Sequence, residues 1–287
     1  MQDWQNLPDH LLVEILRPLT VAEAFRAALT CRRWLSVFES PQLWRQIDFN
    51  FFDGFDANKN QLKAVDCYGH CFRSVIIRLN QADLENRLLA TEAIAKIAQI
   101  PNRQVQNVTI EFTGENPLFY GGQEFVEALE SFARTSGNLK KTLVKVDLKS
   151  LPVNLVDSLV YALQSHYPTL QYLDLQNRQL VCQVTSECIN SLVANCPNLV
   201  DLRVFHASLS DAVLWSISKT EALQHLSILC RRQEKFKSED LSDLAWLAVT
   251  EAKPLFRVTL KFDYTCPLWK GEGGGSDKGY ACWCWFL

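Results

Sequence analysis

The chain of 287 residues has little that marks a secreted, membrane-spanning or nucleic-acid-binding protein. Its opening, MQDWQNLPDH, has no basic segment followed by an apolar one, so we expect no signal peptide. It also lacks a run of about 18 apolar residues, the length that predicts a membrane span. The formal net charge is only −3 and no basic cluster stands out, which argues against a nucleic-acid partner.

Residue patterns typical of cofactor and catalytic sites are also scarce. Cys67, His70 and Cys71 lie close together in CYGHC, but zinc sites usually need a second such cluster at a defined spacing. His206 stands near serines and an aspartate in a predicted loop, where helix capping is commoner than a hydrolytic triad. We therefore expect no metal, no cofactor and no catalytic residue, and keep hydrolysis at the His206 loop as an alternative. Without a secretory signal, the ten cysteines are expected to be reduced thiols.

What the chain does contain begins with an apolar helical stripe. Leu11, Ile15 and Leu19 recur every four residues, and Leu12 and Leu16 stand beside them. This spacing predicts a helix with a wide apolar face.

Two further helices follow in the sequence. Thr20 and Glu23 have the spacing of a capping box and predict the start of a second helix. Ser40 and Pro41 predict a short third helix that ends near Trp44. Three short helices cannot bury so wide an apolar face by themselves, so either the downstream chain or a partner helix covers it.

The motifs LPDHLLVEIL, LTCRRW and the closing LW resemble an F-box over residues 3–48, in order and at the family's spacing. Thr30 departs from the pattern, because the family usually has valine there. The resemblance implies docking on the Skp-type adaptor of cullin–RING ubiquitin ligases. The residues that it assigns to the adaptor-binding face are Leu7, Pro8, Leu11, Leu12, Ile15, Leu16, Leu19 and Trp34, the last shared with the module's own core.

The rest of the chain is a repeat in which an apolar residue is followed by apolar residues three and five positions on. The last two lie two apart, which places both on one face of a strand. The seven segments begin at Phe72, Val105, Leu143, Leu170, Leu199, Leu223 and Leu255. Helical spacing separates them, as at Ile189, Leu192 and Val193. Because one strand–helix unit cannot bury its own face, we expect the units to stack into a solenoid over residues 49–262.

Two phrases, NCPNLVDLRV at 195–204 and YPTLQYLDL at 167–175, resemble the repeat junctions of F-box/leucine-rich-repeat proteins. With the N-terminal module, the resemblance to this family covers residues 3–262. It implies an α/β fold, with a three-helix F-box followed by an irregular leucine-rich-repeat solenoid that has parallel strands on its concave face and helices outside. The asparagine or cysteine of the usual repeat ladder is missing, and Arg178, Ala207 and Arg231 stand in its place.

The same resemblance implies a non-catalytic subunit of an SCF-type (Skp–cullin–F-box) ubiquitin ligase. Such a subunit binds the Skp-type adaptor, and through it cullin and RING subunits, and recruits a protein substrate for ubiquitination and proteasomal degradation. A scaffold or inhibitor that binds a partner without ubiquitination is the alternative. We expect a cytoplasmic location, with the nucleus as a second one. Candidate substrate-binding positions between the apolar strand residues are Tyr172, Asp174, Asp201, Arg203 and His225.

The C-terminal segment 263–287 departs from the repeat. Its glycines and serine, followed by an aromatic end, predict a flexible tail that replaces further repeats. The last four residues fit a loose prenylation box at Cys284, although bulky residues stand at its two aliphatic positions. We expect contact with a membrane only if Cys284 carries a lipid.

Overall fold

The computed structural model describes residues 7–52, 55–117, 120–135, 142–177, 182–231, 241–263 and 280–286. The chain divides into two compact units. The first contains Met1–Tyr120 and Thr135–Leu143, and the second contains Gly121–Arg134 and Val144–Leu287. Among the described helices, none has both the length and the apolar character that a membrane crossing requires.

The first unit begins with four short helices rather than the three expected. They are α1 (Asp9–Leu16), α2 (Val21–Ala28), α3 (Arg32–Phe38) and α4 (Pro41–Trp44). The predicted second helix is interrupted because Cys31 has an extended backbone, with φ −157° and ψ 162°. The Thr30 hydroxyl donates to the Ala27 carbonyl just before the break. Thr30, which departs from the family pattern, therefore lies at the point where the chain turns.

The starts of α2 and α4 were predicted correctly from their capping residues. The Thr20 hydroxyl accepts from the Glu23 N–H at 3.3 Å, and the Glu23 carboxylate accepts from the Thr20 N–H at 2.9 Å, which confirms the capping box of α2. The Ser40 hydroxyl caps α4, and Pro41 is the first residue of that helix. These local hydrogen bonds satisfy N–H groups that the helices leave unpaired.

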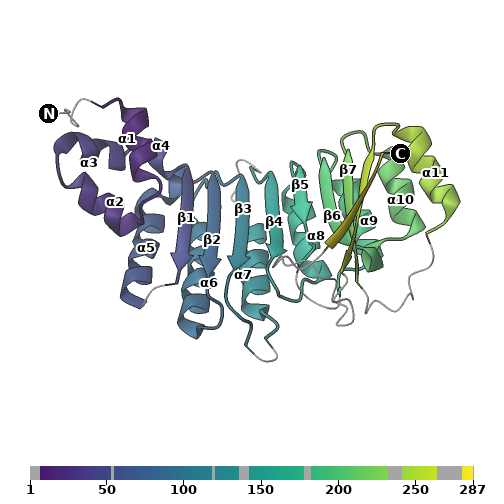
Figure 1. Cartoon of the computed structure of the whole chain (residues 1–287), viewed down its shortest axis with the longest axis horizontal. Coiled ribbons are helices and arrows are strands. Elements are labelled where there is room, and N and C mark those ends of the chain that lie inside the picture. The colour runs from purple at the N-terminus through teal and green to yellow at the C-terminus, as the bar shows by residue number, and fades with distance from the viewer. Residues whose placement is uncertain are drawn as a thin grey trace, which may run out of the picture. The chain divides into compact units, whose positions relative to one another are not determined.

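A parallel sheet completes the first unit. Its strands are β1 (Gln46–Phe51), β2 (Ser74–Leu79) and β3 (Asn107–Phe112), with α5 (Phe55–Tyr68), the short η2 (Gly69–Cys71) and α6 (Leu84–Gln99) between them. In Figure 1, α5 and α6 lie on one side of these strands. Alternate side chains of each strand are buried, as a half-covered sheet requires.

Strand β1 was missed, and the predicted boundary between residues 48 and 49 falls inside it. Trp44, Ile47 and Phe49 have the same spacing as the seven predicted strand segments, and all three are buried. The repeat therefore begins one unit earlier than expected, because Trp44 serves both the helical module and the first strand segment.

The second unit holds six strands and five α-helices among its described residues. The strands are β4 (Lys145–Ser150), β5 (Tyr172–Asp174), β6 (Asp201–Phe205), β7 (His225–Arg231), β8 (Arg257–Asp263) and β9 (Tyr280–Phe286). The helices are α7 (Gln123–Arg134), α8 (Asp157–His166), α9 (Ser186–Asn195), α10 (Asp211–Lys219) and α11 (Asp243–Ala252), with a short η3 (His206–Ser208). Strands β4 to β8 are parallel, and α7 to α11 pack against one another in chain order on one side of them (Figure 1). The parallel strands and outer helices confirm the leucine-rich-repeat arrangement.

All seven predicted strand segments form strands, but the last one has a different buried residue. Leu255 is 91% exposed, whereas Phe256 is 2% exposed. The Phe256 N–H donates to the Lys253 carbonyl at 3.0 Å, in the same turn that Leu199 makes with Cys196. Phe256 therefore takes the core position of Leu199, because the last repeat is one residue shorter before its strand.

Hydrogen bonds from carboxylates link the N-termini of neighbouring outer helices. The Asp157 carboxylate accepts from both the N–H and the hydroxyl of Thr185, which precedes α9, at 2.8 and 2.7 Å. The Asp211 carboxylate accepts from the same two groups of Ser242, which precedes α11, at 2.9 and 2.6 Å. A carboxylate at the start of one helix thus fixes where a later helix begins.

The expectation of a flexible tail is wrong for residues 280–286, which form β9. This strand pairs antiparallel with β8, from Arg257 opposite Phe286 to Asp263 opposite Tyr280. Aromatic residues favour strands, and the outer edge of β8 offers backbone groups for pairing. Cys284 lies opposite Thr259 in this pairing, and its lipidation stays a prediction. The rest of the tail after Asp263 lies outside the described residues.

Candidate functional site

Helices α1 and α2, with the residues that directly follow them, expose large apolar side chains. The exposed fractions are 42% for Leu11, 36% for Ile15, 37% for Leu19, 47% for Phe25 and 62% for Leu29. Leu11 and Ile15 stand four residues apart on α1, and Phe25 and Leu29 are likewise four apart, so each pair shares one face of its helical segment. We call these five residues the open helical surface.

The predicted adaptor-binding residues divide into two groups. Leu12 and Leu16 are buried in the core of the helical module, and their role in adaptor binding stays a prediction. They pack inward because a stripe as wide as this one turns only one edge to solvent when the other edge faces the core. Pro8 is exposed, while Leu7 and Trp34 are partly buried. Docking through the exposed residues stays a prediction.

Trp44 belongs to the core that joins the helical module to the first repeat. Its ring stacks on Tyr68 of α5, with centroids 4.1 Å apart, and meets the edge of Phe38 at 5.1 Å. Its Nε1–H donates to the Phe38 carbonyl at 2.6 Å. The buried indole therefore has both its apolar contacts and its hydrogen bond satisfied within the chain.

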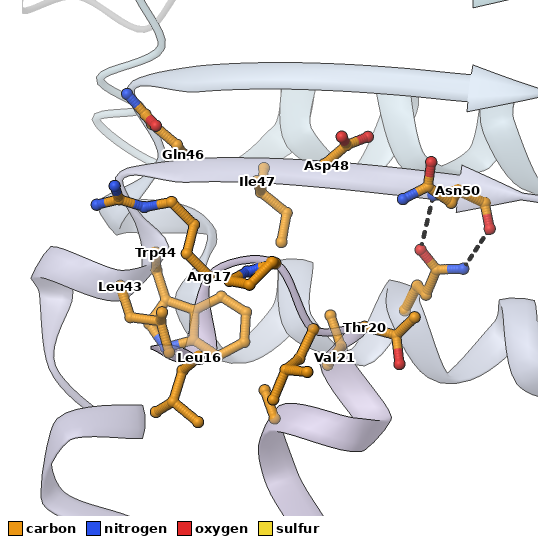
Figure 2. Close-up of a pocket in the computed structure, with 14 residues that line it drawn as sticks. Leu16, Arg17, Thr20, Val21, Leu43, Trp44, Gln46, Ile47, Asp48 and Asn50 are labelled. Carbon is orange, nitrogen blue, oxygen red and sulfur yellow. Dashed lines mark hydrogen bonds between the residues drawn. The ribbon is translucent and has the colours of Figure 1, made fainter. Parts of the chain in front are cut away.

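A small pocket lies between the helical module and β1 (Figure 2). Its volume is about 160 Å³, and Leu16, Trp44 and Ile47 are among the residues that line it. On its polar side, the Gln61 amide hydrogen-bonds both backbone groups of Asn50, at 2.9 and 2.7 Å (Figure 2). The pocket is about large enough for one benzene-sized group. Its one carboxylate, Asp48, is paired with Arg78, so the pocket offers little chemistry.

The second candidate surface is the side of β4–β8 turned away from the helices. In the register of these strands, Lys145, Tyr172, Asp201, His225 and Arg257 are successive neighbours in one row. The next row, two residues further along each strand, contains Asp147, Asp174, Arg203, Ser227 and Thr259. We call these two rows the polar strand face. All five predicted substrate-binding positions lie in it, and their role in binding stays a prediction.

Arg203 organises the centre of the polar strand face. Its Nε and Nη2 donate to the two carboxylate oxygens of Asp201 at 3.2 and 3.0 Å, and its Nη1 lies 3.6 Å from Asp174. Burial disfavours the charge of Asp201, but hydrogen bonds from His225 and Arg203 outweigh it and lower the pKa of this carboxyl. The geometry is the paired fork that favours arginine over lysine at such positions.

Tyr172 lies between two cations. The Lys145 Nζ is 4.6 Å and the Arg203 Cζ 4.9 Å from the centre of its ring. The Tyr172 hydroxyl donates to Asp174 at 3.3 Å, and the Gln176 N–H donates to the same carboxylate at 2.9 Å. Burial nevertheless raises the pKa of Asp174 to about 6, and the nearby charge of Asp147 adds to this.

Asp201, His225 and Thr259 form a hydrogen-bonded chain like that of a hydrolytic triad. The His225 Nδ1 lies 3.1 Å from Asp201, and its Nε2 lies 2.9 Å from the Thr259 hydroxyl. Acyl transfer also needs donors that stabilise an oxyanion. The strand that holds Thr259 is paired with β7 on one side and β9 on the other, so its N–H groups are engaged in the sheet. The arrangement therefore favours binding over catalysis.

Gln176, two residues after Asp174, is a buried polar residue that was not predicted from the sequence. Its buried amide donates to the carbonyls of Val204 and Ser227 at 3.1 and 2.7 Å and accepts from Lys261 at 2.9 Å. It thus links the residues after β5 to three later strands, as the missing asparagine ladder would. The ladder position expected at Arg178 lies outside the described residues, and Gln176 stands two positions before it.

The other candidate positions are dispersed. Across the described ranges, no group of three or more His, Cys, Asp or Glu residues is placed to hold a metal. Cys67 and His70 are exposed while Cys71 is buried. Ser208, near His206, is buried and its hydroxyl donates to the Val184 carbonyl at 2.8 Å, so it serves packing in that loop.

Comparison with known proteins agrees with this geometry. Residues 4–50 match the family model described as F-box-like, and the parallel strands and outer helices that follow form a leucine-rich-repeat type of α/β fold. Among its relatives is F-box/LRR-repeat protein 8 of Homo sapiens, which is 25% identical over 266 residues, or 92% of this chain and 69% of the relative. F-box/LRR-repeat protein 21 of Mus musculus is 25% identical over 274 residues, or 91% of this chain and 60% of the relative. The resemblance to F-box/leucine-rich-repeat proteins is thereby confirmed.

Proposed function

We propose that the chain is a non-catalytic substrate-recognition subunit of an SCF-type ubiquitin ligase in the cytoplasm. The F-box-like domain binds the Skp-type adaptor, and through it the cullin and RING subunits. The polar strand face holds a protein substrate. Two binding surfaces on one chain raise the effective concentration of substrate lysines near the ubiquitin donor, so no catalytic residue is needed.

The observation that carries this proposal is the open helical surface. Leu12 and Leu16 pack inward, so α1 is fixed by its own core, yet Leu11 and Ile15 remain exposed on the same helix. Apolar side chains gathered on a helix suit an amphipathic partner helix, which would cover them. Fully burying a leucine-sized side chain contributes about 1.5–3 kcal/mol, and these two are about two-fifths exposed, so each would add about 1 kcal/mol.

The test replaces Leu11 and Ile15 together by Asp. We expect capture of the purified Skp-type adaptor to be lost, because two carboxylates cannot be buried against an apolar helix. The matched control replaces Leu84 and Leu88 by Asp, since this pair also stands four residues apart on an exposed helix of the first unit. Far-ultraviolet circular dichroism should be the same for both variants.

Adaptor capture that survives Leu11→Asp/Ile15→Asp, with normal dichroism, would refute the proposal. A reconstituted ligase distinguishes a substrate receptor from the alternative of a scaffold or inhibitor. Ubiquitin transfer to a bound partner supports a substrate receptor, whereas adaptor binding without transfer supports the alternative.

A further inference from the structure

We propose that the polar strand face binds an acidic peptide segment, with carboxylates held at its two ends by Lys145 and Arg257. This inference rests on the proposed function, because it names the chemistry of the substrate that the same surface would hold. It is carried by the exposure, spacing and rigidity of the residues in the two rows.

The accessible charge of this face is positive although it contains three carboxylates. The Lys145 side chain is 42% exposed, compared with 21% for Asp147, 20% for Asp201 and 0% for Asp174. Lys149 on β4 and Arg257 on β8 are exposed as well. An approaching partner therefore meets ammonium and guanidinium groups first and carboxylates beneath them, which favours an acidic segment.

The two end cations fix the length of that segment. Lys145 and Arg257 stand at opposite ends of a row that crosses five neighbouring strands. With strands about 4.8 Å apart, the row is about 19 Å long. An extended peptide advances about 3.3 Å per residue, so about six steps, or about seven residues, span the row and place an acidic residue at each end.

The centre of the row is already ordered before any partner arrives. Arg203 is held by two carboxylates, and Tyr172 is held between Lys145 and Arg203. Tyrosine and arginine are frequent hot spots of protein interfaces, and side chains that are already fixed lose little conformational entropy on binding. This favours recognition by the middle of the peptide as well as by its ends.

The carboxylates of this face also make a polyanion an unfavourable partner. Asp201 lies in the row between the end cations, and Asp147 lies 3.9 Å from the Lys145 ammonium on the same strand, so both would repel a continuous phosphate backbone. A peptide with discrete carboxylates can leave uncharged residues over them. The face is therefore suited to a peptide with separated acidic groups rather than to a nucleic acid.

The probe is a fluorescein-labelled peptide, Glu-Glu-Gly-Ser-Ser-Gly-Glu-Glu, titrated with the full chain and followed by fluorescence anisotropy at low ionic strength. We expect Lys145→Glu/Arg257→Glu to weaken binding by about tenfold or more, because each reversal replaces an attraction by a repulsion. Added salt should weaken it as well. The control is Lys219→Glu on α10, an exposed lysine of the helical layer, and should leave the affinity unchanged.

Three outcomes would overturn the inference. These are no binding of the peptide, equal binding by wild type and Lys145→Glu/Arg257→Glu, or tighter binding of a single-stranded DNA oligonucleotide than of the peptide. Adaptor capture is measured on the same samples. If peptide binding fails while Leu11-dependent capture persists, the acidic-peptide inference fails and the proposed function stands. If adaptor capture fails while the peptide binds, the proposed function fails and the acidic-peptide inference stands.

Discussion

The buried carboxyl of Asp174 gives a quantitative test of the polar strand face through the variant Asp174→Asn. Asparagine keeps an oxygen that accepts from the Gln176 N–H but carries no charge. Burial raises the pKa of Asp174 from 3.8 to about 6, against the attraction of Arg203 at 3.6 Å. The difference between these pKa values corresponds to about 3 kcal/mol.

The direction of the pH effect follows from the raised pKa. The group contributes stability that is fully present below pH 3.8, where it is protonated in both states, and that is lost as the pH rises through about 6. The wild-type chain should therefore lose about 3 kcal/mol of unfolding free energy from this group between about pH 4 and about pH 7. Asp174→Asn should lack this loss and gain relative stability towards neutral pH.

The assay is urea unfolding followed by tryptophan fluorescence at several pH values. The quantity compared is the difference in unfolding free energy between variant and wild type, because groups distant from Asp174 contribute equally to both. The matched control is Asp243→Asn, which removes one exposed carboxylate charge in the first turn of α11. If Asp174→Asn loses stability at neutral pH, the ion pair with Arg203 dominates burial and the reasoning is wrong.

Two further predictions concern the last repeats. Phe256→Ala should destabilise the second unit by about 3–5 kcal/mol because it empties a core position, while Leu255→Ala at the neighbouring exposed site should change it by less than about 0.5 kcal/mol, both measured by urea unfolding. Equal effects would show that the register of this repeat is misassigned. The Ser242 hydroxyl and N–H lower the pKa of Asp211, so its contribution to stability is present above its ordinary pKa and is lost as the pH falls through the lowered value. Asp211→Ala should therefore lower the melting temperature at neutral pH and less so in acid, and a shift that does not depend on pH would contradict this.

The regular parts of the fold could be predicted because each depends on spacing within a few residues. Apolar residues three and five positions after an anchor predicted seven strands, and the capping residues Thr20 and Ser40 predicted helix starts. Strand β1 satisfied the same spacing, but Trp44 had been assigned to the helical motif before it. The break at Cys31 and the shift from Leu255 to Phe256 depend on turns that change the spacing by one or two residues.

The candidate surfaces were harder to predict because they depend on contacts between distant residues. Alternation along the strands indicated that Asp201 and His225 share a face. The row that joins them to Lys145 and Arg257 appears only when the register of five strands is known. In α1, periodicity alone could not show that Leu12 would pack inward while Leu11 stayed exposed.

The hydrogen bonds from Thr185 to Asp157 and from Ser242 to Asp211 have a consequence for how such a chain can vary. Each of these acidic residues is encoded about 30 positions before the helix whose start it secures, so α9 and α11 each depend on a capping group from the repeat before. A deletion that removes one unit cleanly would leave a later helix without its carboxylate partner. Insertion or deletion of repeats is therefore tolerated best where the carboxylate and the Ser or Thr that donates to it are gained or lost together.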